Sequence, residues 1–190
     1  MAQGLVGSIF AAYGGLRAAQ AEQERRTDEP RILFYAFLTG FLLFLIGLPA
    51  VRHQIGMIDA PNPMAIVLSA RFFGSLFVLP LLLYGLAALA HVAALVFGGR
   101  ASFQSARLSL FWALLVSMPT FILMSLLAAI FGSFIKDTMV FLGLFDLLAF
   151  ARIWGEGLAQ AEGFGRSWWI SLLIVAIPIA SFLAIADIRT

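Results

Sequence analysis

Three ionisable side chains lie where a charge is costly, within long apolar segments or at their ends. Asp146 is the strongest candidate for chemistry, because it interrupts an apolar run about two turns after that run begins. His91 and Arg152 lie near the ends of such runs. If these runs cross a membrane, hydrocarbon penalises each charge, so an ionisable group there is a functional candidate by default. The alternative for Asp146 is a carboxylate that is hydrogen-bonded to Ser or Thr hydroxyls of neighbouring helices.

Arg152 is not placed to neutralise Asp146. The two residues are six positions apart, or about 240° around a helix, so they do not share a face. Arg152 can instead pair with Glu156, four residues further along the same helix. Asp146 therefore needs a partner from another helix, or a polar cavity.

Motifs for the common catalytic and metal sites are missing from the sequence. There is no Gly-x-Ser-x-Gly elbow, no phosphate loop and no His-Glu-x-x-His motif. The chain has no Cys and only two His, which disfavours thiol chemistry and zinc binding. We expect His91 to be hydrogen-bonded rather than a metal ligand. The sequence thus predicts a protein that is not an enzyme and holds no cofactor or metal.

The elements that position these residues are apolar helices. Hydrophobic residues make up 62% of the 190 residues and charged residues only 12%, against roughly 25% in soluble domains. A soluble fold could not keep so much apolar surface from water. The basic residues are scattered rather than gathered into a patch, which argues against nucleic acid. We predict an all-α, polytopic membrane helical bundle.

Five apolar segments are candidates for membrane spans, since about 20 residues cross the hydrocarbon core. They cover residues 32–51, 72–97, 108–131, 138–154 and 168–188. The apolar run that contains the second span extends from residue 64 to residue 97, which is too long for one span. We therefore expect an interfacial turn of helix up to Ala70. Arg71 would then extend to the membrane boundary, and Pro80 would bend the span that follows. The fourth span is the shortest and carries Asp146.

Residues 1–29 form a polar N-terminal segment ahead of the transmembrane domain, residues 30–190. Its apolar residues recur at three- and four-residue spacing, which predicts an amphipathic helix lying on the membrane surface. This face holds Leu5, Val6, Ile9, Phe10, Tyr13 and Leu16. Thr27 or Asp28 can cap the first span, and Pro30 suits its first turn.

The distribution of positive charge predicts the orientation. With the N-terminus in the cytoplasm and five spans, eight of the 12 basic residues lie inside and four outside. The inside set is Arg17, Arg25, Arg26, Arg31, Arg100, Arg107, Arg152 and Arg166; the outside set is Arg52, Arg71, Lys136 and Arg189. We therefore expect an inner-membrane protein with a cytoplasmic N-terminus and a periplasmic C-terminus.

Small residues at four-residue spacing predict where helices pack closely in lipid. One stripe runs through Ala90, Ala94 and Gly98, and a second through Ser109, Ala113, Ser117, Ser125 and Ala129. A third runs through Ala151, Gly155, Ala159 and Gly163. We interpret all three as packing faces of a compact bundle.

One stretch between the second and third spans resembles a known family. It reads Leu83-Tyr84-Gly85-Leu86-Ala87-Ala88-Leu89-Ala90-His91, then Phe97-Gly98-Gly99-Arg100-Ala101-Ser102-Phe103, then Ala106-Arg107-Leu108 and on to Pro119. This pattern is similar to the Yip family of Ypt/Rab-interacting membrane proteins, in particular to short alphaproteobacterial members. The resemblance covers residues 80–120 and implies five spans with a cytoplasmic N-terminus. Rab binding does not carry over, because the long eukaryotic N-terminal region is missing.

The Gly-Gly turn has a plain physical interpretation and a functional one. Gly98 and Gly99 can end a helix, Ser102 can cap the next, and Arg100 and Arg107 can meet anionic headgroups. The turn is then an interhelical connection, or a cytoplasmic docking surface as well.

These observations predict an organising or accessory protein that binds membrane lipids or other integral membrane proteins, with self-association left open. The alternative is a small transporter or channel component with a polar pathway around Asp146.

Overall fold

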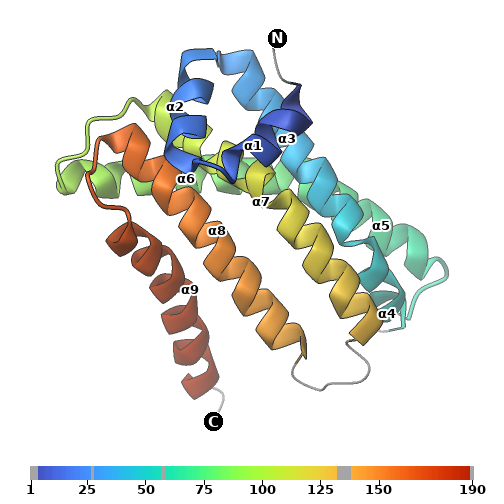
Figure 1. The fold of residues 1–190 in the computed structure, drawn as a ribbon. Coiled ribbons are helices and arrows are strands. Elements are labelled where there is room, and N and C mark those ends of the chain that lie inside the picture. The colour runs from blue at the N-terminus through green and yellow to red at the C-terminus, as the bar shows by residue number, and fades with distance from the viewer. Residues whose placement is uncertain (1–3, 27, 57–58, 132–137, 189–190) are drawn as a thin grey trace.

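The structure, a computed structural model, describes residues 4–26, 28–56, 59–131 and 138–188 of the chain. Every regular element in these ranges is a helix, which confirms the all-α prediction for them (Figure 1). The elements are α1 (Leu5–Ala12), α2 (Leu16–Arg26), α3 (Glu29–Ile46), the 3-10 turn η1 (Leu48–Ala50), α4 (Val51–Ile55), α5 (Pro63–Phe73), the π-helical turn η2 (Gly74–Val78), α6 (Leu79–Val96), α7 (Phe103–Phe131), α8 (Thr138–Glu162) and α9 (Trp168–Ile188). Lys136 and Arg189 of the charge count lie outside the described residues, as do the side chains of Arg52 and His53.

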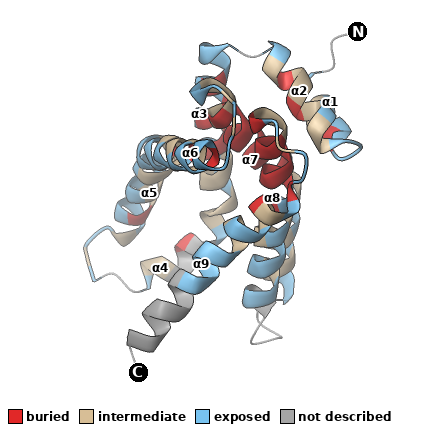
Figure 2. Cartoon of the chain, turned by 90° about the vertical axis from the view of Figure 1, so that its left-hand side faces the viewer, coloured by how far each residue is buried: buried red, intermediate tan, exposed pale blue. Residues whose placement is uncertain are grey.

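Helix α7 is the centre of the molecule. It contacts α3, α6 and α8 as well as the two N-terminal helices, and Figure 2 shows its first half enclosed by them. Phe111, Leu115 and Val116 are fully buried. This half of α7 is apolar on almost every side, which is the pattern of a helix with neighbours all round.

Burial stops halfway along the long helices. Residues 108–118 of α7 and Ala151, Trp154 and Ala159 of α8 are buried, whereas the other halves expose large apolar side chains. Leu126 is 57% exposed and Phe141 is 67% exposed. Apolar surface of this extent suits contact with lipid or with another protein.

Three helical stretches are long and apolar enough to cross a membrane: Glu29–Ile46, Pro63–Val96 and Phe103–Phe131. Residues Trp168–Ala180 form a shorter apolar helix. The described residues thus support a membrane protein, while the count of five spans stays a prediction.

The chain from Pro63 to Val96 is one continuous helical stretch that passes through Arg71, and the predicted membrane boundary at Arg71 stays a prediction. The Arg71 guanidinium donates hydrogen bonds to Gly47 O (2.5 Å) and Gln54 Oε1 (3.0 Å), which hold it against the corner after α3. The irregularity comes instead at η2, directly before Pro80. A widened turn accommodates the ring and the missing N–H of the proline.

The N-terminal segment forms a hairpin of two helices, not one continuous amphipathic helix. A turn at Gly14 and Gly15 separates α1 from α2, and both helices pack on α7, with α2 also on α8. The predicted apolar face is thereby divided. Ile9 packs against the core, while Val6 and Phe10 are 66% and 61% exposed.

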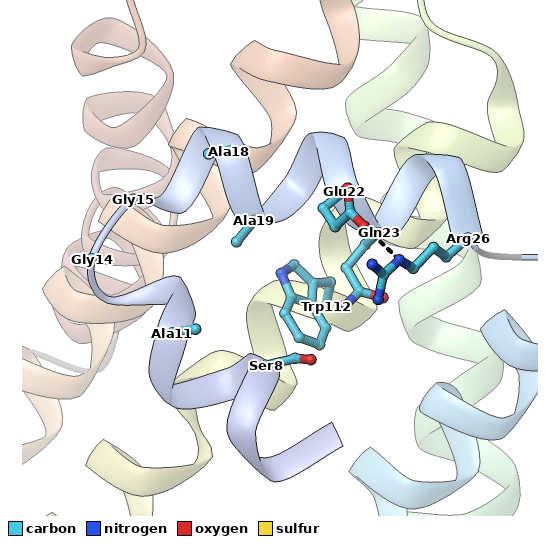
Figure 3. A pocket seen from close by; sticks show the side chains of 10 residues that line it. All are labelled: Ser8, Ala11, Gly14, Gly15, Ala18, Ala19, Glu22, Gln23, Arg26 and Trp112. Carbon is cyan, nitrogen blue, oxygen red and sulfur yellow. Dashed lines mark ion pairs between the residues drawn. The ribbon is translucent and has the colours of Figure 1, made fainter. Parts of the chain in front are cut away.

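The hairpin leaves a depression between α1 and α2, and the buried indole of Trp112 lies at its floor between the two helices (Figure 3). The Tyr13 hydroxyl donates a 2.6 Å hydrogen bond to Val116 O and so attaches the hairpin to the middle of α7. Position on a membrane surface stays a prediction for this segment.

Two of the predicted packing stripes are confirmed in part, since Ser125 is only half-buried and Ala129 and Gly163 are exposed. Ser109, Ala113 and Ser117 of α7 are buried, as are Ala151, Gly155 and Ala159 of α8. At Gly155 the backbone of α9 comes so near that a Cβ would lie 3.2 Å from the Ser171 nitrogen and against its hydroxyl. The stripe thus sets the close crossing of α8 and α9.

Candidate functional site

Helices α6 and α8 end side by side with the same type of C-cap. Gly98 has φ +85° and Gly163 has φ +79°, the left-handed region that glycine adopts without strain. The next N–H in each case returns to the last turn of its helix: Gly99 N to Ala94 O, and Phe164 N to Ala159 O, both at 2.8 Å. These are Schellman caps. The prediction that Gly98 and Gly99 end a helix is confirmed.

Glu162 joins the two helix ends. Its backbone oxygen accepts a 3.1 Å hydrogen bond from Arg100 N, and its Oε2 accepts a 2.9 Å bond from Ala101 N. Its Oε1 lies 2.9 Å from His91 Nδ1. The Glu162 side chain is 0% exposed, so these bonds replace the water that a carboxylate otherwise requires.

The turn is shaped to admit that carboxylate. A Cβ at Gly99 would lie 2.5 Å from Glu162 Oε2 and 2.9 Å from Ala94 O. Only a residue without a side chain lets the turn and the carboxylate approach this closely. The two glycines are therefore needed for different reasons. Gly98 adopts the left-handed backbone angle that ends α6, and Gly99 leaves the space that the Glu162 carboxylate occupies.

Glu156 forms a second polar centre on α8, six residues before Glu162. It lies just after residue 154, the predicted end of the fourth span. Arg17 Nε lies 2.5 Å from Glu156 Oε2, and Arg152 pairs with Oε1, which confirms the predicted pairing of Arg152 and Glu156. Burial raises the pKa of Glu156, but hydrogen bonds from Arg17, Arg152 and Ser167 outweigh it and lower that pKa to about 2. The carboxylate is thus ionised at neutral pH and attaches α2 to α8.

We name these residues the Glu156–Glu162 cluster. It consists of Arg17, His91, Arg152, Glu156, Glu162 and Ser167. The two carboxylates share one end of α8, where α2, the end of α6 and the start of α9 meet (Figure 1). Each is held by groups from other segments of the chain.

The remaining residues of the predicted contact turn have divergent roles. Ser102 Oγ accepts a 3.1 Å hydrogen bond from Ser105 N, which confirms its capping of α7. Arg107 pairs with Glu29 and lies 4.7 Å from the centre of the Phe103 ring, so its partners are in the protein rather than in a headgroup layer. Arg100 is exposed and makes no ion pair with a described residue.

Asp146 is not brought together with His91 and Arg152. It lies ten residues before Glu156, or about 15 Å along the helix. Its Oδ1 is buried and has no hydrogen-bond partner among the described residues. The predicted Ser or Thr partner is therefore not found in the described part of the chain.

Sequence reasoning missed Glu162 and Arg17. Glu162 had a signal, because it lies three residues after Ala159 and seven after Gly155, on the packing stripe of α8. A carboxylate on a face that packs against another helix is buried, so it needs a hydrogen-bond donor from a neighbouring segment. Arg17 had no comparable signal, since its partner is 139 residues away in the chain.

The arrangement offers structure rather than an open reaction centre. A carboxylate beside an imidazole could exchange a proton, but both groups of the Glu162–His91 pair are occupied by one another. No group of three or more His, Asp or Glu residues suited to a metal is present among the described residues. Comparisons with protein-family models, with curated proteins and with solved structures found no match.

Proposed function

We propose that this chain is a non-enzymatic integral membrane protein, an organising or accessory component that binds other membrane proteins or lipids. The observation that carries the proposal is the Glu156–Glu162 cluster. Its charged side chains are engaged with one another and with turn backbone, so they build a fixed surface at one end of the bundle. A rigid surface on an apolar bundle suits recognition, because little order is lost when a partner binds.

The resemblance to the Yip family supports the same proposal. The Gly-Gly turn that carries the resemblance is also the turn that receives Glu162. A bacterial inner-membrane location, five spans, a cytoplasmic N-terminus and a periplasmic C-terminus belong to this proposal. Under it, the Glu156–Glu162 cluster faces the cytoplasm.

The contact surface would include the outer face of α1 and the turn after α6. Val6 and Phe10 project from α1 without a covering element among the described residues. A photo-crosslinking amino acid at Phe10 tests this surface, with the same substitution at Phe141, which is 67% exposed near the other end of the bundle. We expect protein adducts at Phe10 and lipid adducts at Phe141 in intact membranes. Lipid adducts alone at both positions would contradict the binding of a protein partner.

The alternative, a small transporter or channel component, is favoured by one observation. Asp146 Oδ1 is buried without a hydrogen-bond partner in the described residues, as expected for a carboxylate that binds a proton or cation during transport. Asp146→Asn in proteoliposomes, measured as proton or cation flux, separates the two functions, with Glu22→Gln as a surface control. Flux that is present in the control and lost in Asp146→Asn would favour transport. Absence of flux in both variants, with normal assembly of the protein, would exclude the transport function.

A further inference from the structure

An apolar groove of about 480 Å³ runs between α6, α8 and α9, apart from the Glu156–Glu162 cluster. Ala90 and Ala93 line it from α6, Trp154 from α8 and Leu173 from α9. The groove is too narrow for a further helix, which occupies about 1,500 Å³ over a length of ~20 Å. A flexible hydrocarbon chain fits it better.

Aromatic rings close the groove at the end where α6 and α8 terminate. The ring of Trp169 lies 5.5 Å from that of Phe97 and 5.3 Å from that of Phe164. Phe97 directly precedes Gly98, and Phe164 directly follows Gly163. Aromatic side chains of this kind gather at the headgroup level of a bilayer. The groove therefore ends at the turns that carry Arg100 and Arg166.

Those two arginines differ from the three arginines of this end that pair with a glutamate. Arg17, Arg107 and Arg152 are each paired with a glutamate. Arg100 and Arg166 are exposed, and neither forms an ion pair with a residue that the structure describes. Unpaired cations at the mouth of an apolar groove complement an anionic headgroup.

We propose that this groove binds one anionic phospholipid. An acyl chain lies between α6 and α9, against Ala93 and Leu173, and the phosphate lies at Arg100 and Arg166. The inference deepens the proposed function and rests on it for the placement of the chain in a membrane. It names the lipid class and the groove residues that recognise it.

The headgroup is tested with the full-length protein in detergent, delipidated and titrated with phosphatidylglycerol or phosphatidylcholine, and analysed by native mass spectrometry. We expect one bound phosphatidylglycerol, held more tightly than phosphatidylcholine. Arg100→Gln and Arg166→Gln should each reduce that preference about fivefold, the effect of one basic residue near an anionic surface. Arg25→Gln removes the same charge from α2 and should leave the preference unchanged.

Equal retention of both lipids by the wild type would overturn the proposal, as would an equal effect of Arg25→Gln. Glycerol phosphate that binds as tightly as the whole lipid would show a phosphate site without the groove, which also overturns the proposal.

The groove is tested by filling it. Ala93→Trp should abolish retention of the lipid, whereas Val92→Trp, at an exposed neighbour that does not line the groove, should retain it. Leu173→Ala removes apolar surface from the wall of the groove without filling it, so it should lower retention several-fold. This variant decides the question if Ala93→Trp does not fold, because unchanged retention in Leu173→Ala together with Val92→Trp contradicts the proposal.

The lipid-binding experiments and the crosslinking at Phe10 can fail independently of one another. Equal lipid binding with protein adducts at Phe10 would remove the lipid site alone. Specific phosphatidylglycerol binding with only lipid adducts at Phe10 would leave a lipid-binding membrane protein without the protein-organising role.

Discussion

At the scale of single residues, the charged groups near the end of the bundle are structural. Glu162 has no exposed side-chain surface, yet it joins His91, the turn backbone and α8 through three hydrogen bonds. Buried ions are tolerated when every oxygen has a donor, and they destabilise strongly when one partner is removed. Asp146 is the exception, since its buried Oδ1 lacks such a donor in the described chain.

Glu162→Ala should destabilise the protein by about 2 kcal/mol, because the N–H of Ala101 and the His91 ring lose their acceptor in a buried site. Thermal unfolding in detergent, followed by near-ultraviolet circular dichroism, measures this loss.

Glu22→Ala is the matched control. Glu22 pairs with Arg25 and Arg26 on the exposed surface of α2, where ion pairs contribute about 0–1 kcal/mol. Equal unfolding temperatures for the two variants would contradict a structural role for Glu162.

At the scale of elements, the two matched helix ends determine how the bundle closes. The caps at Gly98 and Gly163 turn the chain out of α6 and α8 at the same level, so that the turn after α6 bonds to the last residue of α8. The small-residue stripe on α8 brings α9 close, and the hairpin of α1 and α2 covers α7. Helix ends and small faces, rather than large side chains, thus set the packing here.

Gly98→Ala should cost about 1 kcal/mol, because an alanine at φ +85° is strained. The change in unfolding temperature of the purified protein measures this cost.

Gly143→Ala provides the comparison within α8. Nothing lies within 4 Å of a Cβ at Gly143, and alanine favours a helix by roughly 1 kcal/mol over glycine, so this variant should be neutral or stabilised. A stabilised Gly98→Ala would show that the cap does not need a left-handed residue.

At the scale of the whole molecule, the chain is well packed at one end and open at the other. The packed end holds the hairpin, the Glu156–Glu162 cluster and the buried half of α7. The other end has exposed apolar side chains along α7 and α8, and Figure 2 colours many residues of these halves as exposed. The attachment of the hairpin relies partly on one ion pair, between Arg17 and Glu156.

Acid should weaken the packed end. The pKa of Glu156 in the folded protein, about 2, is below its ordinary value of 4.5. Its stabilising contribution is therefore complete above about pH 4.5 and is lost as the pH falls toward 2. We expect the unfolding temperature to fall across this window, measured by tryptophan fluorescence in detergent.

Glu156→Gln removes the titrating group, so the fall over the same window should be smaller. Glu22→Gln should keep the wild-type pH profile. An unchanged profile in Glu156→Gln would show that other carboxylates govern the acid response.

Local features could be predicted from the sequence because their causes lie within a few residues. Asp28 caps α3 by accepting from Arg31 N, Ser102 caps α7, and Arg152 pairs with Glu156 one turn away. Contacts between distant segments could not be predicted. The Arg71 guanidinium donates a hydrogen bond to Gly47 O, 24 residues away, and no local pattern indicates that contact.

What the sequence by itself determined is the helical, apolar character of the chain and the residues that begin and end its helices. Hydropathy, caps and glycines act locally, and no partner is needed to interpret them. Only the tertiary structure decided which charges meet. Glu162 and His91 are 71 residues apart, and Arg17 and Glu156 are 139 apart. Such pairs depend on which helix ends lie side by side, and the packing of the whole bundle sets that.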